Sequence, residues 1–273
     1  MKTMNKVLAK TALAVVLGTG AVGASADLIT QWTATVTGEW STAPGDTVFS
    51  GGSGLTYESS DLLSWGADLG PAVDPVNGAN SQESRSGLQI GTSPVMGMVD
   101  TNGAAIDTIE VTHFNNTIFG EFATLESAVF LTTLTLTPLA PVAGPSLPTV
   151  SQTIPIMFQE TPNIAANCTA ASVTVCDDIF VFEPESLTFD FSLDGFTYFT
   201  QIGAPGLGVL ADDECAQAGA ASGCLGLTTP EQEASTVVFN FQISARPNAV
   251  PAPATLALLG MGLLGFAARK RRA

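Results

Sequence analysis

Four cysteines are the residues of this 273-residue chain whose type and spacing suggest chemistry most directly. Cys168 and Cys176 form one closely spaced pair, and Cys215 and Cys224 form another. Outside the cytoplasm an even number of cysteines favours disulfides, and the spacing favours Cys168–Cys176 and Cys215–Cys224 among three possible connectivities. A zinc site is the alternative, but neither pair has C-x-x-C spacing and the single histidine, His113, is distant in sequence. The pattern therefore predicts two disulfides.

Carboxylates are the second chemically capable group, with 25 acidic residues against 9 basic ones. All of the acidic residues lie between Asp27 and Glu233, which makes the body strongly acidic and excludes nucleic acid as a partner. Acidic clusters beside the cysteines could bind calcium through oxygen ligands, but no D-x-D-x-D-G loop makes that specific. We favour solvated acidic loops and predict no metal site and no cofactor, with calcium as the one ion considered. The clusters are Asp177–Asp178 and Asp212–Glu214.

Catalytic motifs are not evident, so no catalytic residue is predicted. No G-x-S-x-G nucleophile elbow occurs, and paired cysteines offer no thiolate. Two carboxylates suited to glycoside hydrolysis are available among 25, but no spacing selects them. His113 lies on one face of an expected strand with Ile109 and Val111. We favour a structural histidine bonded to loop backbone or to Asn115 over a ligand pocket built from His113 and Asn115.

Short segments with period-two alternation must position these residues. Val237, Phe239, Phe241 and Ile243 share one face of such a segment, for example. The turns between segments contain Gly, Pro, Asn and Asp, which predicts an all-β antiparallel β-sandwich of jelly-roll or Greek-key type over residues 27–249. The Pro-rich stretch 138–148 is either a linker or a long loop of that sandwich. The expected strands are 31–37, 106–111, 128–136, 154–158, 179–182, 187–193 and 237–243.

The N-terminal residues 1–26 have the layout of a secretory signal peptide. Lysines precede a short apolar run, and small residues end at Ala24 and Ala26, which places cleavage before Asp27. An N-terminal membrane anchor is the alternative, but the apolar run is short for a membrane span. The general secretion machinery and signal peptidase are therefore expected partners.

The C-terminal residues 250–273 combine a proline site, a short apolar helix and a basic tail. The uncharged stretch of 15 residues before the tail would rise about 22 Å as a helix, less than the roughly 30 Å hydrocarbon core of a bilayer. This arrangement resembles the PEP-CTERM sorting signal, whose substrates are processed by the membrane transpeptidase exosortase. Ala252 stands where that signal has Glu, and a permanent anchor is the alternative. The signal residues are Val250, Pro251, Ala252, Pro253, Ala254, Arg269, Lys270, Arg271 and Arg272.

The tetrapeptide Thr112-His113-Phe114-Asn115 is the label motif of the THxN family of PEP-CTERM proteins, and its residues Thr112, His113 and Asn115 carry the resemblance. The segments Leu63-Ser64-Trp65-Gly66 and Ser86-Gly87-Leu88 are similar to recurring elements of such exported domains. The resemblance implies an extracellular β-rich domain without implying an activity.

These observations predict a non-enzymatic, exported protein, and the family resemblance implies a structural or adhesive role for it. The resemblance implies transient anchoring in the inner membrane by the C-terminal helix, followed by delivery to the cell surface or extracellular matrix, where exopolysaccharide or biofilm material is an expected partner. A carbohydrate- or calcium-binding module is the first alternative, with exposed Trp or Tyr available to stack on sugars. A polysaccharide-active enzyme is the second alternative.

Overall fold

Alternation of inward and outward side chains produces long strands in this protein. In β1 (Gln31–Trp40) every second side chain is buried, including Trp32, Ala34 and Val36, while threonines and charged groups face outward. This pattern is what a strand with one covered face requires. The computed structural model describes residues 27–67, 85–161, 168, 172, 176–182 and 188–248. The predicted signal peptide with Ala24 and Ala26, and the predicted sorting signal at 250–273, lie outside these residues.

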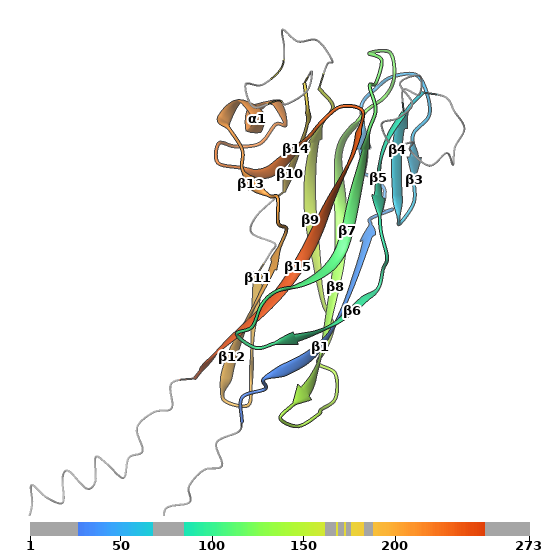
Figure 1. Cartoon of the computed structure of the whole chain (residues 1–273). Helices are drawn as coiled ribbons and strands as arrows, with labels where there is room; N and C mark the ends of the chain where they lie inside the picture. The colour runs from blue at the N-terminus through green and yellow to red at the C-terminus, as the bar shows by residue number, and fades with distance from the viewer. Residues whose placement is uncertain are drawn as a thin grey trace, which may run out of the picture.

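Two antiparallel sheets pack against each other along an elongated body (Figure 1). The first sheet has the order β13-β14-β10-β9-β8-β1-β6, with β2 (Val48–Phe49) paired to β8. The second has the order β11-β12-β15-β7-β5-β4-β3. The first sheet contains β6 (Val95–Asp100), β8 (Leu125–Ala140), β9 (Val150–Gln159), β10 (Asp178–Phe182), β13 (Gly208–Val209) and β14 (Leu225–Thr229). The second contains β3 (Tyr57–Glu58), β4 (Leu62–Gly66), β5 (Arg85–Ile90), β7 (Ile106–Asn115), β11 (Thr188–Leu193), β12 (Phe196–Gly203) and β15 (Glu233–Pro247).

The core lies between the two sheets and is rich in aromatic side chains. Trp32, Trp40 and Trp65 are all buried in one contiguous cluster with aliphatic residues from both sheets. A second, smaller cluster forms where α1 (Asp212–Gln217) covers Ile179 and Val181 on the outer face of β10. Among the described residues no helix is long and apolar enough to cross a membrane.

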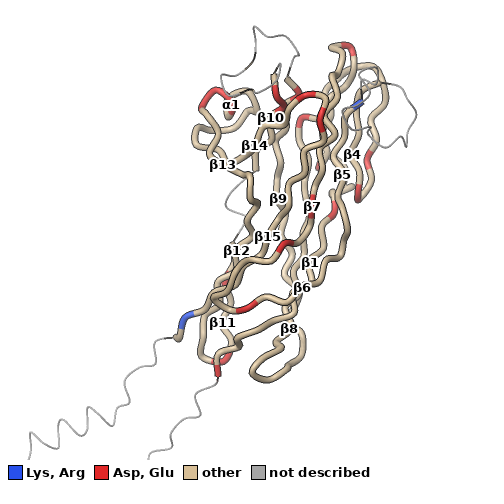
Figure 2. The backbone as a smooth tube through the Cα atoms, viewed as in Figure 1, with Lys and Arg blue, Asp and Glu red and all other residues tan. Residues whose placement is uncertain are grey.

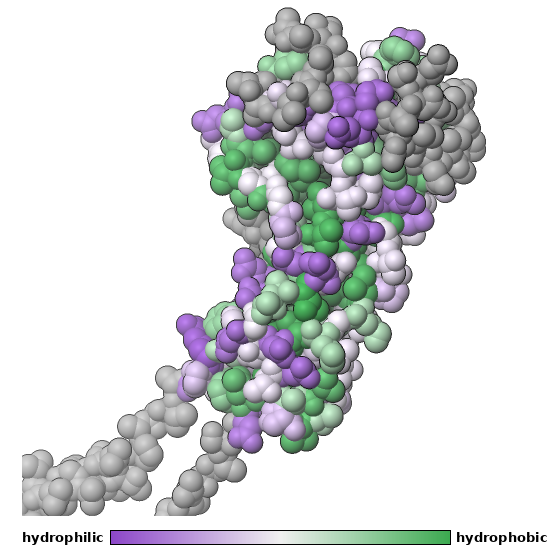
Figure 3. Space-filling view, viewed as in Figure 1, coloured by the Kyte–Doolittle hydropathy of each residue, from purple (hydrophilic) through white to green (hydrophobic). Residues whose placement is uncertain are grey.

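The all-β antiparallel sandwich predicted from the sequence is confirmed. Each of the seven expected segments forms a strand, and most strands extend further than the alternation indicated. The Pro-rich stretch 138–148 begins in β8 and continues into the connection to β9, its neighbour in the same sheet. Figure 2 shows acidic residues along the length of the body, and Figure 3 shows polar and apolar side chains intermixed on the face in view.

Both ends of the described chain leave the sandwich at the same tip (Figure 1). The Tyr198 hydroxyl accepts a hydrogen bond from the Ile29 backbone N–H at 3.0 Å, while Tyr198 is paired with Ala245 near the end of β15. The Asn248 N–H donates to the Gly195 carbonyl in the turn between β11 and β12. The strand pair β11–β12 therefore holds both the first and the last described segments.

Replacing Tyr198 by phenylalanine should lower the free energy of unfolding by about 1–3 kcal/mol, because a buried N–H loses its only hydroxyl partner while the ring remains. Tyr198 is 0% exposed and packs edge-on against Trp32 at 5.1 Å, so the aromatic packing should survive the change. Urea denaturation measures the effect, and hydrogen exchange at Ile29 should accelerate more than exchange in β9. Unchanged exchange at Ile29 would contradict this role of the hydroxyl.

Candidate functional site

Three carboxylates meet at the tip of the sandwich opposite the chain ends. Oxygens of Glu160, Asp178 and Glu231 all lie within 4.8 Å of one another. Asp178 is 0% exposed and Glu231 is 8% exposed, whereas Glu160 is half-buried with its Oε1 shielded from solvent. Three acidic groups this close and this buried are unusual, because each charged pair at this separation repels by about 3–4 kcal/mol at an effective dielectric constant of 20.

Strand pairing in the first sheet brings these carboxylates together. Glu160 directly follows the end of β9, Asp178 begins β10, and Glu231 lies two residues after the end of β14. The three strands are adjacent and antiparallel, with Ile179 opposite Gln159 and Asp178 opposite Thr229. The end of β9, the start of β10 and the end of β14 therefore lie at the same edge of the sheet.

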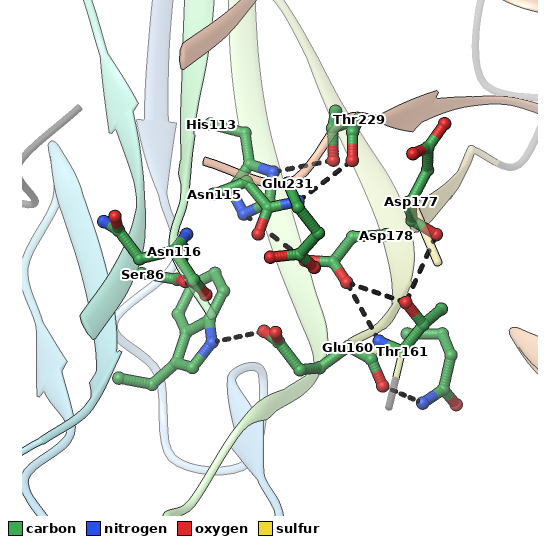
Figure 4. A network of polar contacts seen from close by, with 12 residues as sticks. Ser86, His113, Asn115, Asn116, Glu160, Thr161, Asp177, Asp178, Thr229 and Glu231 are labelled. Carbon is green, nitrogen blue, oxygen red and sulfur yellow. Dashed lines mark hydrogen bonds and ion pairs between the residues drawn. The ribbon is translucent and has the colours of Figure 1, made fainter. Parts of the chain in front are cut away.

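The second sheet contributes polar side chains to the same place (Figure 4). The Asn115 amide donates from Nδ2 to the Thr229 carbonyl at 2.9 Å, and His113 Nδ1 is 2.9 Å from the Thr229 hydroxyl. Trp65 donates from Nε1 to Glu160 Oε2 at 3.0 Å. Side chains from β4 and β7 thus meet the carboxylates from β9, β10 and β14 across the sandwich.

Each carboxylate has one oxygen held by a donor of the protein. Glu160 Oε2 accepts from Trp65, Asp178 Oδ1 accepts from the Thr161 N–H at 2.9 Å, and Glu231 Oε2 lies 3.4 Å from the Thr117 hydroxyl. The other oxygens of Glu160 and Asp178 are buried without a hydrogen-bond partner, as is Asn115 Oδ1. Buried polar atoms normally have partners, so three such oxygens in one cluster call for an explanation.

Burial controls the charge of this site. Burial, followed by the repulsion of neighbouring carboxylates, raises the pKa of Asp178 well above its usual value. Burial likewise raises the pKa of Glu160, while the hydrogen bond from Trp65 partly opposes that shift. Burial lowers the pKa of His113 to about 3, so this imidazole is neutral at physiological pH. The site therefore consists of carboxyl groups that disfavour one another's ionisation, beside a neutral histidine.

Two disulfides brace the strands that carry the site. The predicted bonds Cys168–Cys176 and Cys215–Cys224 are both present, so the zinc alternative is wrong. The first closes the segment between Glu160 and Asp178, and the Cys176 carbonyl accepts from the Thr161 hydroxyl. The second ties α1 to the residue that precedes β14.

Left-handed backbone conformations flank the site as well. Cys176, two residues before Asp178, has φ of 63°, and Gln232, next to Glu231, also has φ of 63°. Such values are uncommon for residues other than Gly, Asn and Asp, and they concentrate at sites where the chain must place a neighbouring group.

The segments that carry the predicted resemblance to the THxN family meet at this tip. Strand β4 with Trp65 pairs with β5, which pairs with β7, and the Ser86 hydroxyl donates to the Asn116 carbonyl at 2.9 Å. His113 is buried between Trp65, Phe158 and Phe180 and bonds Thr229, where loop backbone or Asn115 was the expected partner. Thr112 faces Thr236 across the sheet, with their hydroxyls 2.8 Å apart, away from the carboxylates.

Two expectations from the sequence are wrong. Asp177 and Asp178 were expected in a solvated loop, but they are 1% and 0% exposed. In the second cluster Asp212 and Asp213 are exposed as expected, but Glu214 is buried at 3%. Exposed tryptophans or tyrosines were considered for sugar stacking, but all three tryptophans and Tyr198 are buried, and Tyr57 on β3 is half-buried.

Sequence reasoning missed Glu160, Glu231 and Thr229 as site residues. Glu160 directly follows β9, which ends in a glutamine, and Glu231 closely follows β14, which ends in a threonine. Neither strand ends in a glycine of the kind that marks a turn. That signal is weak, because many of the 25 acidic residues stand at strand ends. Only the register of β9, β10 and β14 selects these three.

The chain was compared with known proteins. Residues 249–272 match the PEP-CTERM protein-sorting motif, which agrees with the boundaries 250–273 expected from the sequence. No curated protein is significantly similar to the chain. The match covers the C-terminal segment directly after the sandwich and implies export, a membrane-anchored sorting signal and processing by exosortase. This chain therefore carries the sorting motif of PEP-CTERM proteins, the substrates of exosortase, at the end of an exported β-sandwich.

Proposed function

We propose that the sandwich is a non-enzymatic structural or adhesive domain that exosortase delivers to the cell surface or extracellular matrix. The observation that carries this proposal is the position of the chain ends. The sorting motif begins directly after Asn248, at the tip held by β11 and β12. Strand β15 has 15 residues and runs from that tip to the carboxylate site, a distance of about 45 Å at roughly 3.3 Å per residue. Attachment through the C-terminus leaves the opposite tip exposed to partners.

The carboxylate site supports binding better than hydrolysis. Glycoside hydrolysis needs a sugar between two carboxylates that are about 5 Å or 6.5–9.5 Å apart. Asp178 is completely buried, Glu231 is nearly so, and their oxygens lie within 4.8 Å of each other beside Glu160. The separation itself is close to the shorter of these two distances, but a sugar ring cannot reach groups buried this completely, which favours the non-enzymatic proposal over a polysaccharide-active enzyme.

Intact mass spectrometry tests the delivery. We expect a mature species that starts at Asp27 and ends between Val250 and Ala254, recovered from the cell surface or medium, with about four mass units gained on reduction of two disulfides. The Ala252 site is the informative feature, because it departs from the Pro-Glu-Pro pattern of the signal. A C-terminus intact through Ala273 and found only in membranes would show a permanent anchor and contradict processing.

Genetic complementation tests the structural role. A strain that lacks the chain should lose surface-attached matrix, and the wild-type chain should restore it in proportion to the amount retained at the surface. A truncated form ending at Asn248, exported but not sorted, should restore little. Full restoration by small amounts of this released form would indicate turnover and overturn the structural proposal. The Asp190→Asn chain, changed at an exposed site on β11, serves as the matched control.

A further inference from the structure

We propose that Glu160, Asp178, Glu231 and the Asn115 side-chain oxygen form a binding site for one calcium ion. Each of the three carboxylates offers one oxygen, and these oxygens lie within 4.8 Å of one another. The three residues lie at the ends of three neighbouring strands. The Asn115 side chain extends from β7 in the other sheet and lies beside Glu231 (Figure 4). The ion would therefore join the two sheets at the tip opposite Asn248, the last residue before the sorting motif.

The unsatisfied oxygens are the independent evidence for a bound cation. Asn115 is 0% exposed, and its Nδ2 is committed to the Thr229 carbonyl, which fixes the amide so that Oδ1 is the remaining polar atom. That Oδ1 is buried without a partner, as are Glu160 Oε1 and Asp178 Oδ2. An amide oxygen only accepts hydrogen bonds, and so does each carboxylate oxygen once its acid has lost the proton, so the ionised groups cannot satisfy one another. A cation placed among them satisfies all three.

The hydrogen bonds around the cluster leave the coordinating oxygens available. Trp65 and Thr161 hold Glu160 Oε2 and Asp178 Oδ1, so the second oxygen of each carboxylate is the one directed at the site. Metal ligands in proteins are commonly oriented by such outer partners. His113 differs from these partners, because its Nε2 faces Asp178 Oδ2, the oxygen left for the ion, at 3.9 Å, which is beyond hydrogen-bond distance, while its Nδ1 is engaged by Thr229.

The chemistry of the ligands favours calcium over other divalent ions. All four proposed ligands are oxygens, and calcium takes 6–8 oxygen ligands, including carboxylates, amide oxygens and waters, in flexible geometry. Zinc prefers nitrogen and sulfur ligands, but all four cysteines are in disulfides, and the single histidine offers only one nitrogen, His113 Nε2, which lies 3.9 Å from Asp178 Oδ2. Magnesium keeps several of its waters in a strict octahedron, which a cluster of three buried carboxylates leaves little room for.

Calcium binding should be visible as thermal stabilisation of the exported protein, purified with both disulfides intact and stripped with a chelator. At a hundredfold excess of calcium over its dissociation constant we expect the melting temperature to rise by roughly 5–10 °C, because the ion binds only the folded chain. Isothermal titration should give one site per chain. Terbium, which replaces calcium at oxygen sites, should luminesce when tryptophan is excited, because Trp65 contacts the ligand Glu160.

Isosteric variants separate the site from the rest of the acidic surface. Asp178→Asn keeps an acceptor for the Thr161 N–H, so the chain should fold, and should melt higher than the wild type without calcium because one buried acid is removed. The same variant should lose the calcium-induced shift and the terbium signal. Glu160→Gln is a second test, and Asp190→Asn on β11 is the control with the same charge change at an exposed position.

Several results would overturn the proposal. These are an unchanged melting temperature in millimolar calcium, an equal shift in magnesium, a larger shift in zinc, or a full calcium response in both Asp178→Asn and Glu160→Gln. Loss of the response in Asp190→Asn as well would show that calcium acts on the acidic surface in general. None of these measurements depends on sorting or on surface attachment, so the calcium site and the proposed function can fail separately.

Discussion

Replacing Trp65 by alanine is expected to lower the free energy of unfolding by about 3–5 kcal/mol, the cost of emptying a fully buried aromatic position. For a domain of this size the melting temperature should fall by roughly 6–20 °C. Trp65 is 0% exposed and contacts Phe158 at 5.1 Å and His113 at 5.9 Å between ring centroids. It lies on β4 and joins the second sheet to Glu160 at the end of β9 in the first. Its loss should loosen the tip of the sandwich before the rest.

A comparison of two phenylalanine variants isolates the hydrogen bond of Trp65 from its bulk. Trp40 is equally buried, but its Nε1 has no hydrogen-bond partner, whereas Trp65 Nε1 donates to Glu160. Trp65→Phe should therefore cost about 1–3 kcal/mol more than Trp40→Phe in urea denaturation. Equal costs for the two variants would show that the bond to Glu160 contributes nothing and that only ring volume matters at position 65.

Strands with one covered face were predictable from the sequence, because burial on one side imposes alternation. β1, β8 and β15 show that alternation over 10 to 16 residues. β4 was not predicted as a strand: all five of its residues are buried, as in β10, but β10 after its first residue is a run of aromatic and β-branched residues, whereas β4 contains Ser64 and Gly66. β5 was missed for a similar reason, since only one of its six residues is not buried. Strands that are covered on both faces lack the alternation of apolar and polar residues that identifies a strand with one exposed face.

The site was less predictable than the fold. Glu160, Asp178 and Glu231 are far apart in the sequence, and each resembles an ordinary acidic residue near a turn. Their meeting depends on the register in which Ile179 pairs with Gln159 and Asp178 pairs with Thr229, and a shift of one residue would turn Asp178 to the other face. The tetrapeptide around His113 did indicate residues of the site, but the residues that His113 and Asn115 contact come from the opposite sheet and could not be identified from the sequence.

The two disulfides were predictable because they are local, but their purpose was not. Cys168 and Cys176 are 8 residues apart, and Cys215 and Cys224 are 9 apart, so neither bond joins distant parts of the fold. Loop-closure entropy gives each about 2.5 kcal/mol, and the extra residue changes that figure by only about 0.1 kcal/mol. In the entropic model the two bonds are thus a matched pair, and any difference between them in calcium binding must come from where they lie.

Replacing Cys168 and Cys176 by serine should lower the free energy of unfolding by about 2.5 kcal/mol and should also weaken calcium binding by at least tenfold. The Cys176 carbonyl accepts from the Thr161 hydroxyl, and the Thr161 N–H holds Asp178 Oδ1, so this disulfide lies two contacts from a proposed ligand. Thermal melts with and without calcium measure both effects in one experiment.

The double serine variant of Cys215 and Cys224 is the control. It should lose a similar amount of stability, because α1 and the smaller core cluster over Ile179 loosen, yet keep most of the calcium-induced shift. Glu231 lies seven residues beyond Cys224 and is separated from it by β14, which remains paired to β10 over five residues. If both variants lost the calcium response equally, the first disulfide would have no special role at the site, and general stability would explain its effect. If only the Cys168–Cys176 variant loses it, the bond positions Asp178 for the ion.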